Sequence, residues 1–206
     1  MMKKTTFAFA ALAALAFSGT AAAQVCAGFP IRDGQGSLSA LANFPSGFDQ
    51  YGVEGAYNFT GPLAINGGFI YSTANGEHLN TFRAGAALDI STMMATMLPG
   101  LSICPNVRAD FTSQDGTDVV EVPIGLGLGA TLPLGDQSMT LTPYVIPALV
   151  WSHFNDDTLG SDSETNFGIR GGADLNFDRF FLGGTVEWVN VEGSDAVFGV
   201  RAGIKF

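Results

Sequence analysis

The chain has 206 residues, enough for a single domain, and its 19 acidic residues outnumber its 9 basic ones to give a formal net charge of −10. This acidic balance makes it a poor candidate for binding nucleic acid or anionic lipid head groups. The longest uncharged stretches, residues 90–107 and 137–155, each contain two prolines, so neither is expected to form a membrane-spanning helix.

Residues 1–23 are typical of a secretory signal peptide. Lys3 and Lys4 precede an apolar run at 7–17, and small residues end the segment at Ala21–Ala23. The apolar run is too short to cross a bilayer as a helix, which takes roughly 20 residues. We expect cleavage before Gln24 and an exported domain at 24–206. Lipid attachment at Cys26 is less favoured, because Val25 precedes it where a small residue is usual.

From about residue 49 onward, apolar residues recur at every second position. This period of two predicts β-strands, at 49–60, 63–72, 81–90, 103–112, 119–132, 139–151, 166–177, 182–189 and 196–206. Nine strands cannot bring both chain ends to the same side of a membrane, so we expect 36–44 to supply a tenth. Eight strands remain possible if the N-terminal segment or one weak segment stays outside the wall.

The ionised residues inside these segments all fall on the non-apolar parity, which otherwise consists largely of glycine. A soluble β-sandwich would crowd its wet face with Lys, Glu and Thr. Glycines with sparse opposite charges instead suit a narrow barrel lumen. The predicted fold is therefore all-β: a transmembrane antiparallel up-and-down β-barrel with its apolar face toward lipid. Its expected lumen charge ladder comprises Glu54, Arg83, Arg108, Glu121, Arg170, Asp174, Glu187 and Arg201.

The connections between the predicted strands alternate in length. Those at 61–62, 133–138 and 178–180 are short, as periplasmic turns are, whereas 73–80, 113–118 and 153–165 are longer and polar, as outer loops are. Residues 91–100 are too apolar for an ordinary turn and are expected to form a short helix or extended strand ends. Aromatic residues fall into two expected girdles, an outer one of Tyr51, Tyr71, Phe82, Phe111, Trp151, Phe167, Trp188 and Phe198 and an inner one of Phe59, Phe177, Phe180 and Phe206.

The signal segment, the alternating strands and the final strand VFGVRAGIKF resemble the small outer-membrane β-barrel families of diderm bacteria, the OmpA/OmpX-like group. The resemblance implies a monomer in the cell outer membrane, in contact with outer-membrane lipid. It also implies recognition by the barrel-assembly machinery, whose signal is matched here by Val200, Ala202, Ile204 and Phe206.

The two cysteines, Cys26 and Cys104, both fall near the inner rim in this topology. Because the periplasm is oxidising, we expect a disulfide between them. The alternative is that they serve as two separate small apolar residues.

No constellation points to catalysis. His153 lies at an outer strand end, but the residue two positions later is Asn155 and not a nucleophile, and Ser152 points to the opposite face. The acidic segment 155–165 lacks the spacing of an EF-hand and is expected to be a solvated loop. GLGLG at 125–129 alternates within a strand and is not followed by a helix, so it is not expected to bind phosphate. We expect no enzymatic activity, no metal and no cofactor.

Two functions follow from the pattern of charges. The favoured one is a structural or surface-interaction role, with the lumen closed by the internal salt-bridge ladder. The alternative is a narrow, porin-like channel for ions or small solutes, because the same charges could line a pore.

Overall fold

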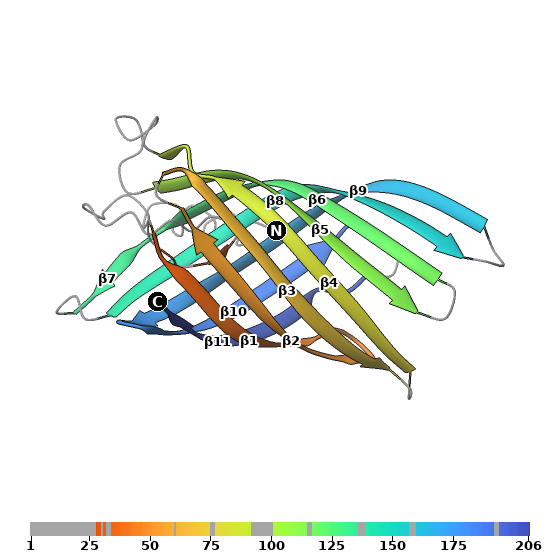
Figure 1. Ribbon diagram of the computed structural model, residues 1–206, viewed down its shortest axis with the longest axis horizontal. Helices are drawn as coiled ribbons and strands as arrows, with labels where there is room; N and C mark the ends of the chain where they lie inside the picture. Colours follow the sequence, from red (N-terminus) through yellow and green to blue (C-terminus); the bar gives the residue numbers. More distant parts are fainter. Residues whose placement is uncertain are drawn as a thin grey trace, which may run out of the picture.

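The computed structural model (Figure 1) describes residues 28–29, 31, 34–59, 61–74, 77–91, 101–114, 117–135, 139–156, 160–191 and 194–206. The predicted signal peptide, Cys26 and residues 92–100 lie outside these described residues. Within the described ranges, no helix has both the length and the apolar character needed to cross a membrane.

One continuous antiparallel sheet contains all the strands. They are β1 Gly36–Phe44, β2 Asp49–Asn58, β3 Leu63–Ala74, β4 Glu77–Leu88, β5 Leu101–Gln114, β6 Thr117–Ala130, β7 Leu132–Leu134, β8 Met139–Asp156, β9 Gly160–Phe177, β10 Phe180–Val189 and β11 Val197–Lys205. Apart from β6 and β7, neighbours in the chain pair with one another; β6 pairs with β8, and β1 pairs with β11. The short β7 pairs only with the start of β8, so the other ten strands form the closed up-and-down barrel that the sequence predicts.

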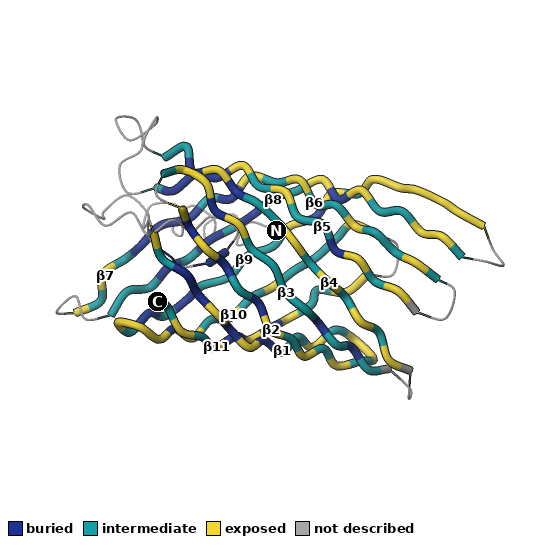
Figure 2. Tube along the Cα trace, in the orientation of Figure 1, coloured by how far each residue is buried: buried dark blue, intermediate teal, exposed yellow. Residues whose placement is uncertain are grey.

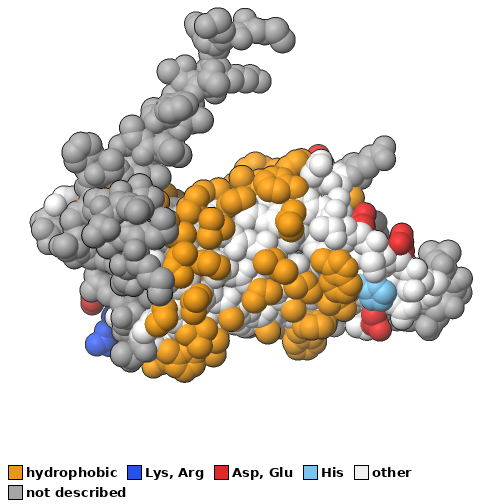
Figure 3. Space-filling view, turned by 90° about the horizontal axis from the view of Figure 1, so that it is seen from above, with side chains coloured by type: hydrophobic (Ala, Val, Ile, Leu, Met, Phe, Trp, Pro, Cys, Tyr) orange, Lys and Arg blue, Asp and Glu red, His pale blue; other side chains and the backbone are white. Residues whose placement is uncertain are grey.

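Buried and exposed residues alternate along the strands (Figure 2). Outward-facing apolar side chains are exposed, among them Phe82 at 61%, Ile124 at 61% and Leu149 at 60%. Inward-facing polar residues are buried instead, including Glu54, Asp110 and Asp174. Seen from above, apolar side chains cover much of the wall, and acidic side chains lie beyond them at the end on the right (Figure 3). The barrel is thus apolar outside and polar inside, the arrangement that a membrane-spanning barrel requires.

The predicted long loops are wrong in extent, because the strands continue into them. Pairing runs to Ala74↔Glu77 in β3–β4, to Gln114↔Thr117 in β5–β6 and to Asp156↔Gly160 in β8–β9. The apolar alternation stops where both faces of a hairpin are polar, but backbone pairing does not depend on that alternation. In Figure 1 the β8–β9 hairpin projects farthest beyond the wall.

We call the end of the barrel that carries the β8–β9 hairpin tip the hairpin end, and the opposite end, where Gly36 and Phe206 exchange backbone hydrogen bonds, the terminal end. Exposed aromatic side chains flank the apolar wall on both sides. Those toward the hairpin end are Phe44, Tyr51, Phe82, Phe111, Trp151, Phe154, Phe167 and Phe198, and those toward the terminal end are Tyr57, Phe59, Phe180 and Phe206.

Candidate functional site

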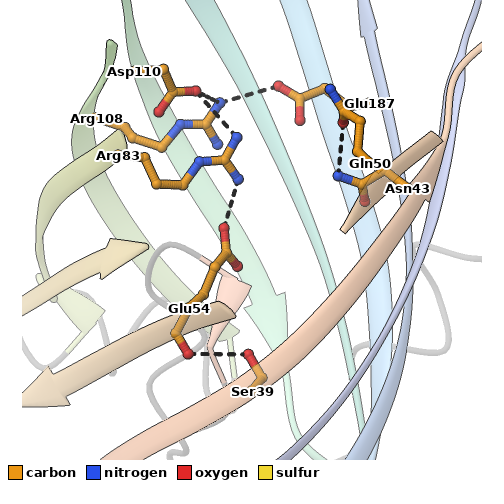
Figure 4. A network of polar contacts seen from close by, with 8 residues as sticks. All are labelled: Ser39, Asn43, Gln50, Glu54, Arg83, Arg108, Asp110 and Glu187. Atoms are coloured by element: carbon orange, nitrogen blue, oxygen red, sulfur yellow. Dashed lines mark hydrogen bonds and ion pairs between the residues drawn. The ribbon is translucent and has the colours of Figure 1, made fainter. Parts of the chain in front are cut away.

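The lumen contains an ion network of five side chains, drawn with their neighbours in Figure 4. Arg83 on β4 lies at its centre, with its Nη1 2.6 Å from Glu54 Oε1 and its Nη2 3.3 Å from Asp110 Oδ2. Arg108 extends the network, since its Nη2 lies 2.9 Å from Asp110 Oδ2 and 3.3 Å from Glu187 Oε1. Because β5 and β10 are not neighbours in the sheet, the network crosses the lumen from wall to wall.

The register of the sheet brings these charges together. Arg83 is the direct cross-strand partner of Asp110, and Arg108 lies two residues before Asp110 on the same face of β5. Gly68 on β3 pairs with both Glu54 and Arg83 and so separates them. A Cβ at Gly68 would lie 2.8 Å from Glu54 Cγ, so only glycine leaves room for the carboxylate and guanidinium to meet across it.

Glu121 differs from the expected ladder. It is exposed and makes no ion pair with the part of the chain that the structure describes. Its cross-strand partner is Asp110, another acid. Asp110 accepts both arginines, a role that the sequence analysis did not assign to it although it shares the lumen parity.

Arg170 lies beside the ion network. Together with Arg108 and Glu187 it lines a cavity of about 30 Å³. A cavity of this size holds on the order of two water molecules. The space that these three side chains line is therefore small.

A second cluster lies nearer the terminal end, around Arg201 on β11. Its Nε lies 2.9 Å from Asp174 Oδ1 and its Nη2 lies 2.6 Å from Asp174 Oδ2, in a buried bidentate pair. Three rings surround the guanidinium, with centroids at 5.3 Å for Phe29, 5.7 Å for Tyr144 and 5.8 Å for Phe181. Arginine is suited to this setting because it can form a fork with a carboxylate and stack on aromatic faces at the same time.

Residues before β1 lie inside the barrel at this cluster. Arg201 Nη2 also donates a hydrogen bond to the backbone carbonyl of Gly28. Phe29 and Ile31 are buried in a cluster with Ala56, Ala87 and Cys104. The sequence analysis missed this segment, because it has no periodicity that would mark it as part of the fold.

Cys104 points into the lumen and is buried. None of the described cysteines is free. Its expected partner, Cys26, lies outside the described residues, so the Cys26–Cys104 disulfide stays a prediction.

His153 has a partner that sequence reasoning did not find. Its Nδ1 lies 2.7 Å from Ser163 Oγ on the neighbouring strand, and its ring stacks on Trp151. Ser163 is exposed and His153 is half-buried, and no carboxylate of a described residue orients the imidazole. No cluster of potential metal ligands occurs among the described residues either. The pair is an ordinary cross-strand contact rather than a nucleophile with an oriented base.

A closed ten-strand wall, apolar outside and charged inside, defines a transmembrane β-barrel protein. No family model matches the sequence, and no curated protein matches it.

Solved structures similar to this one are outer-membrane barrels. The N-terminal β-barrel domain of Pseudomonas aeruginosa OprF is 14% identical, with 84% of this chain and 98% of that chain covered and a TM-score of 0.40. Acinetobacter baumannii Omp33 is 10% identical, with 84% and 98% covered and a TM-score of 0.38. Yersinia pestis Ail is 14% identical, with 85% and 100% covered and a TM-score of 0.33. The likeness concerns the barrel fold alone, and no role for this chain follows from it.

Proposed function

We propose that this protein is a monomeric outer-membrane β-barrel with a closed lumen and a structural or surface-interaction role. The observation that carries the proposal is the ion network that crosses the lumen from Glu54 on β2 to Glu187 on β10. Arg201 and its three surrounding rings form a second obstruction, nearer the terminal end of the lumen.

The network resists opening because its members are mostly buried. The side chains of Arg83, Arg108 and Asp110 are 14%, 12% and 5% exposed. Separating a buried ion pair leaves charges unpaired in a poorly hydrated space, which costs roughly 3–5 kcal/mol. A permanently open path for ions would require several such separations at once.

The outward face supports location in a membrane. Large apolar side chains on every strand of the wall face outward, and exposed aromatic side chains lie toward both ends of this apolar wall, as they do in membrane barrels. The predicted signal peptide and the predicted C-terminal assembly signal favour the outer membrane in particular. Surrounding lipid accounts for this apolar surface without a second protein subunit.

The hairpin end is the part available to partners. The β8–β9 hairpin extends beyond the apolar wall and exposes polar side chains, including Asp162, Ser163 and Glu164. A paired, protruding hairpin presents these groups in a fixed arrangement, which suits a contact surface better than a mobile loop would.

The test is planar-bilayer conductance of refolded residues 24–206. Folding is first confirmed by a difference in gel mobility between boiled and unboiled protein, and an open porin in the same bilayer serves as the positive control. We expect no discrete current steps from the folded protein. Reproducible steps would overturn the closed lumen and establish the narrow channel instead.

A further inference from the structure

We propose that Gly28, Phe29 and Ile31 form an internal plug that closes the terminal half of the lumen and is held there by Arg201. This inference rests on the closed lumen proposed above and adds a second closure, distinct from the ion network.

Burial of its two apolar side chains holds the plug in the lumen. Phe29 is 5% exposed and Ile31 is 1% exposed, although neither belongs to a strand of the wall. They pack against Ala56 of β2, Ala87 of β4 and Cys104 of β5, all of which face the lumen. Burying two large apolar side chains contributes roughly 3–6 kcal/mol, which is enough to hold a short segment in place.

Arg201 contacts the plug at two points. Its Nη2 donates to the Gly28 carbonyl, and its guanidinium carbon lies 5.3 Å from the centre of the Phe29 ring. One wall residue therefore contacts both the backbone and a side chain of the segment.

Gly28 fits its place closely. Its φ is +80°, a conformation that residues with a side chain rarely adopt, and an added Cβ would lie 3.0 Å from Tyr144 Cε2. A methyl group there would oppose the seated position through both strain and contact, while leaving every strand unchanged.

The β-sheet closes into a barrel without any contribution from the plug. Strand β1 begins at Gly36, and its pairing with β11 completes the wall without Gly28, Phe29 or Ile31. If the plug left, Asp174 would still accept both of its hydrogen bonds from Arg201, so no buried charge would lose its partner.

Labelling of the Cys104 thiol tests the plug directly, because Phe29 and Ile31 cover it. In a Cys26→Ser background Cys104 is the sole thiol of the chain. We expect it to react with a maleimide at least tenfold faster after Gly28→Ala. The matched control is Gly47→Ala, which has a similar φ of +91° in the β1–β2 turn but no atom within 4 Å of the added Cβ, and should leave the rate unchanged.

Rates are compared only for protein that keeps the mobility of the folded barrel. Phe29→Ala, which introduces no backbone strain, must accelerate labelling as Gly28→Ala does, and it replaces that variant if Gly28→Ala does not fold. Fast labelling in the background alone, or equal rates in all variants, would overturn the plug.

The two proposals fail separately. Current steps from a protein whose Cys104 is protected would overturn the closed lumen but keep the seated segment. Fast labelling of Cys104 in a protein that gives no current would overturn the plug but keep the closed lumen, because the ion network alone would then close it.

Discussion

Arg201 on β11 and Asp174 on β9 meet across Gly183 of β10, which is the direct cross-strand partner of both. Their Nε–Oδ1 and Nη2–Oδ2 distances are 2.9 and 2.6 Å. A Cβ at Gly183 would overlap the Asp174 carboxylate, so the pair exists only because the residue between its members has no side chain.

Gly183→Ala should therefore destabilise the barrel without changing any charge. We expect the free energy of unfolding to fall by about 3 kcal/mol, because the methyl group separates a buried ion pair. Gly184→Ala is the matched control: its added Cβ meets nothing within 4 Å, and we expect a change below about 0.5 kcal/mol. Urea unfolding in lipid vesicles, followed by the fluorescence of Trp151 and Trp188, measures both. Equal effects would contradict the importance of the pair.

The ion network predicts that two neighbouring acids, Asp110 and Glu121, differ in how much they contribute to the free energy of unfolding. Asp110→Asn removes the charge that both Arg83 and Arg108 contact, and we expect it to cost about 3 kcal/mol. Glu121→Gln should change the free energy of unfolding by less than about 0.5 kcal/mol, because the carboxylate is exposed and no described residue pairs with it. The same urea unfolding assay measures both variants. A large loss of unfolding free energy in Glu121→Gln would show that Glu121 does belong to the lumen charge ladder.

The C-terminal residue should matter for assembly more than for stability. Phe206 is 72% exposed at the terminal end, so its ring contributes little to packing. Phe206→Ala is expected to lower the amount of folded protein in the outer membrane of expressing cells several-fold, while refolding of the purified chain stays unchanged. Phe180→Ala, an aromatic of similar exposure at 63%, is the control and should leave both intact. Parallel losses in cells and after refolding would mean that Phe206 acts through packing.

The predicted Cys26–Cys104 bond can be tested chemically. Phe29, three residues after Cys26, already packs in one cluster with Cys104, so the chain passes close to that thiol. Alkylation of the unfolded, unreduced protein should add no label, and two labels should appear after reduction with dithiothreitol. Cys26→Ser should lower the free energy of unfolding by about 4 kcal/mol at most. Two reactive thiols before reduction would show that the bond is absent.

The wall of the barrel could be predicted from sequence because one physical rule governs it. Each strand must present apolar residues to lipid and polar ones to the lumen, so the period of two marks the strands of the wall from β2 onward. The need for an even number of strands then predicted β1, at its observed bounds of Gly36–Phe44. The ends of β8 and β9 were missed for the same reason, since the rule no longer applies where both faces meet water.

The interior was less predictable. Parity assigns a charge to the lumen but does not say which charges meet, because that depends on the stagger of strands far apart in sequence. Arg108 and Glu187 are 79 residues apart and meet only through closure of the barrel. The plug at Phe29 and Ile31 follows from the shape of the space left inside the wall, for which the sequence carries no periodic signal.

Spin labels on three consecutive residues of β8 test the central claim most directly, with refolded protein in lipid vesicles and one labelled cysteine at a time in place of Ala148, Leu149 or Val150. Leu149 faces outward at 60% exposure, whereas Val150 is buried and Ala148 shares its inward parity. The account predicts that the label at 149 relaxes with lipid-dissolved oxygen and that those at 148 and 150 respond to neither oxygen nor a water-soluble nickel complex. Strong relaxation by nickel at 148 and 150 would contradict it by showing an open, water-filled lumen.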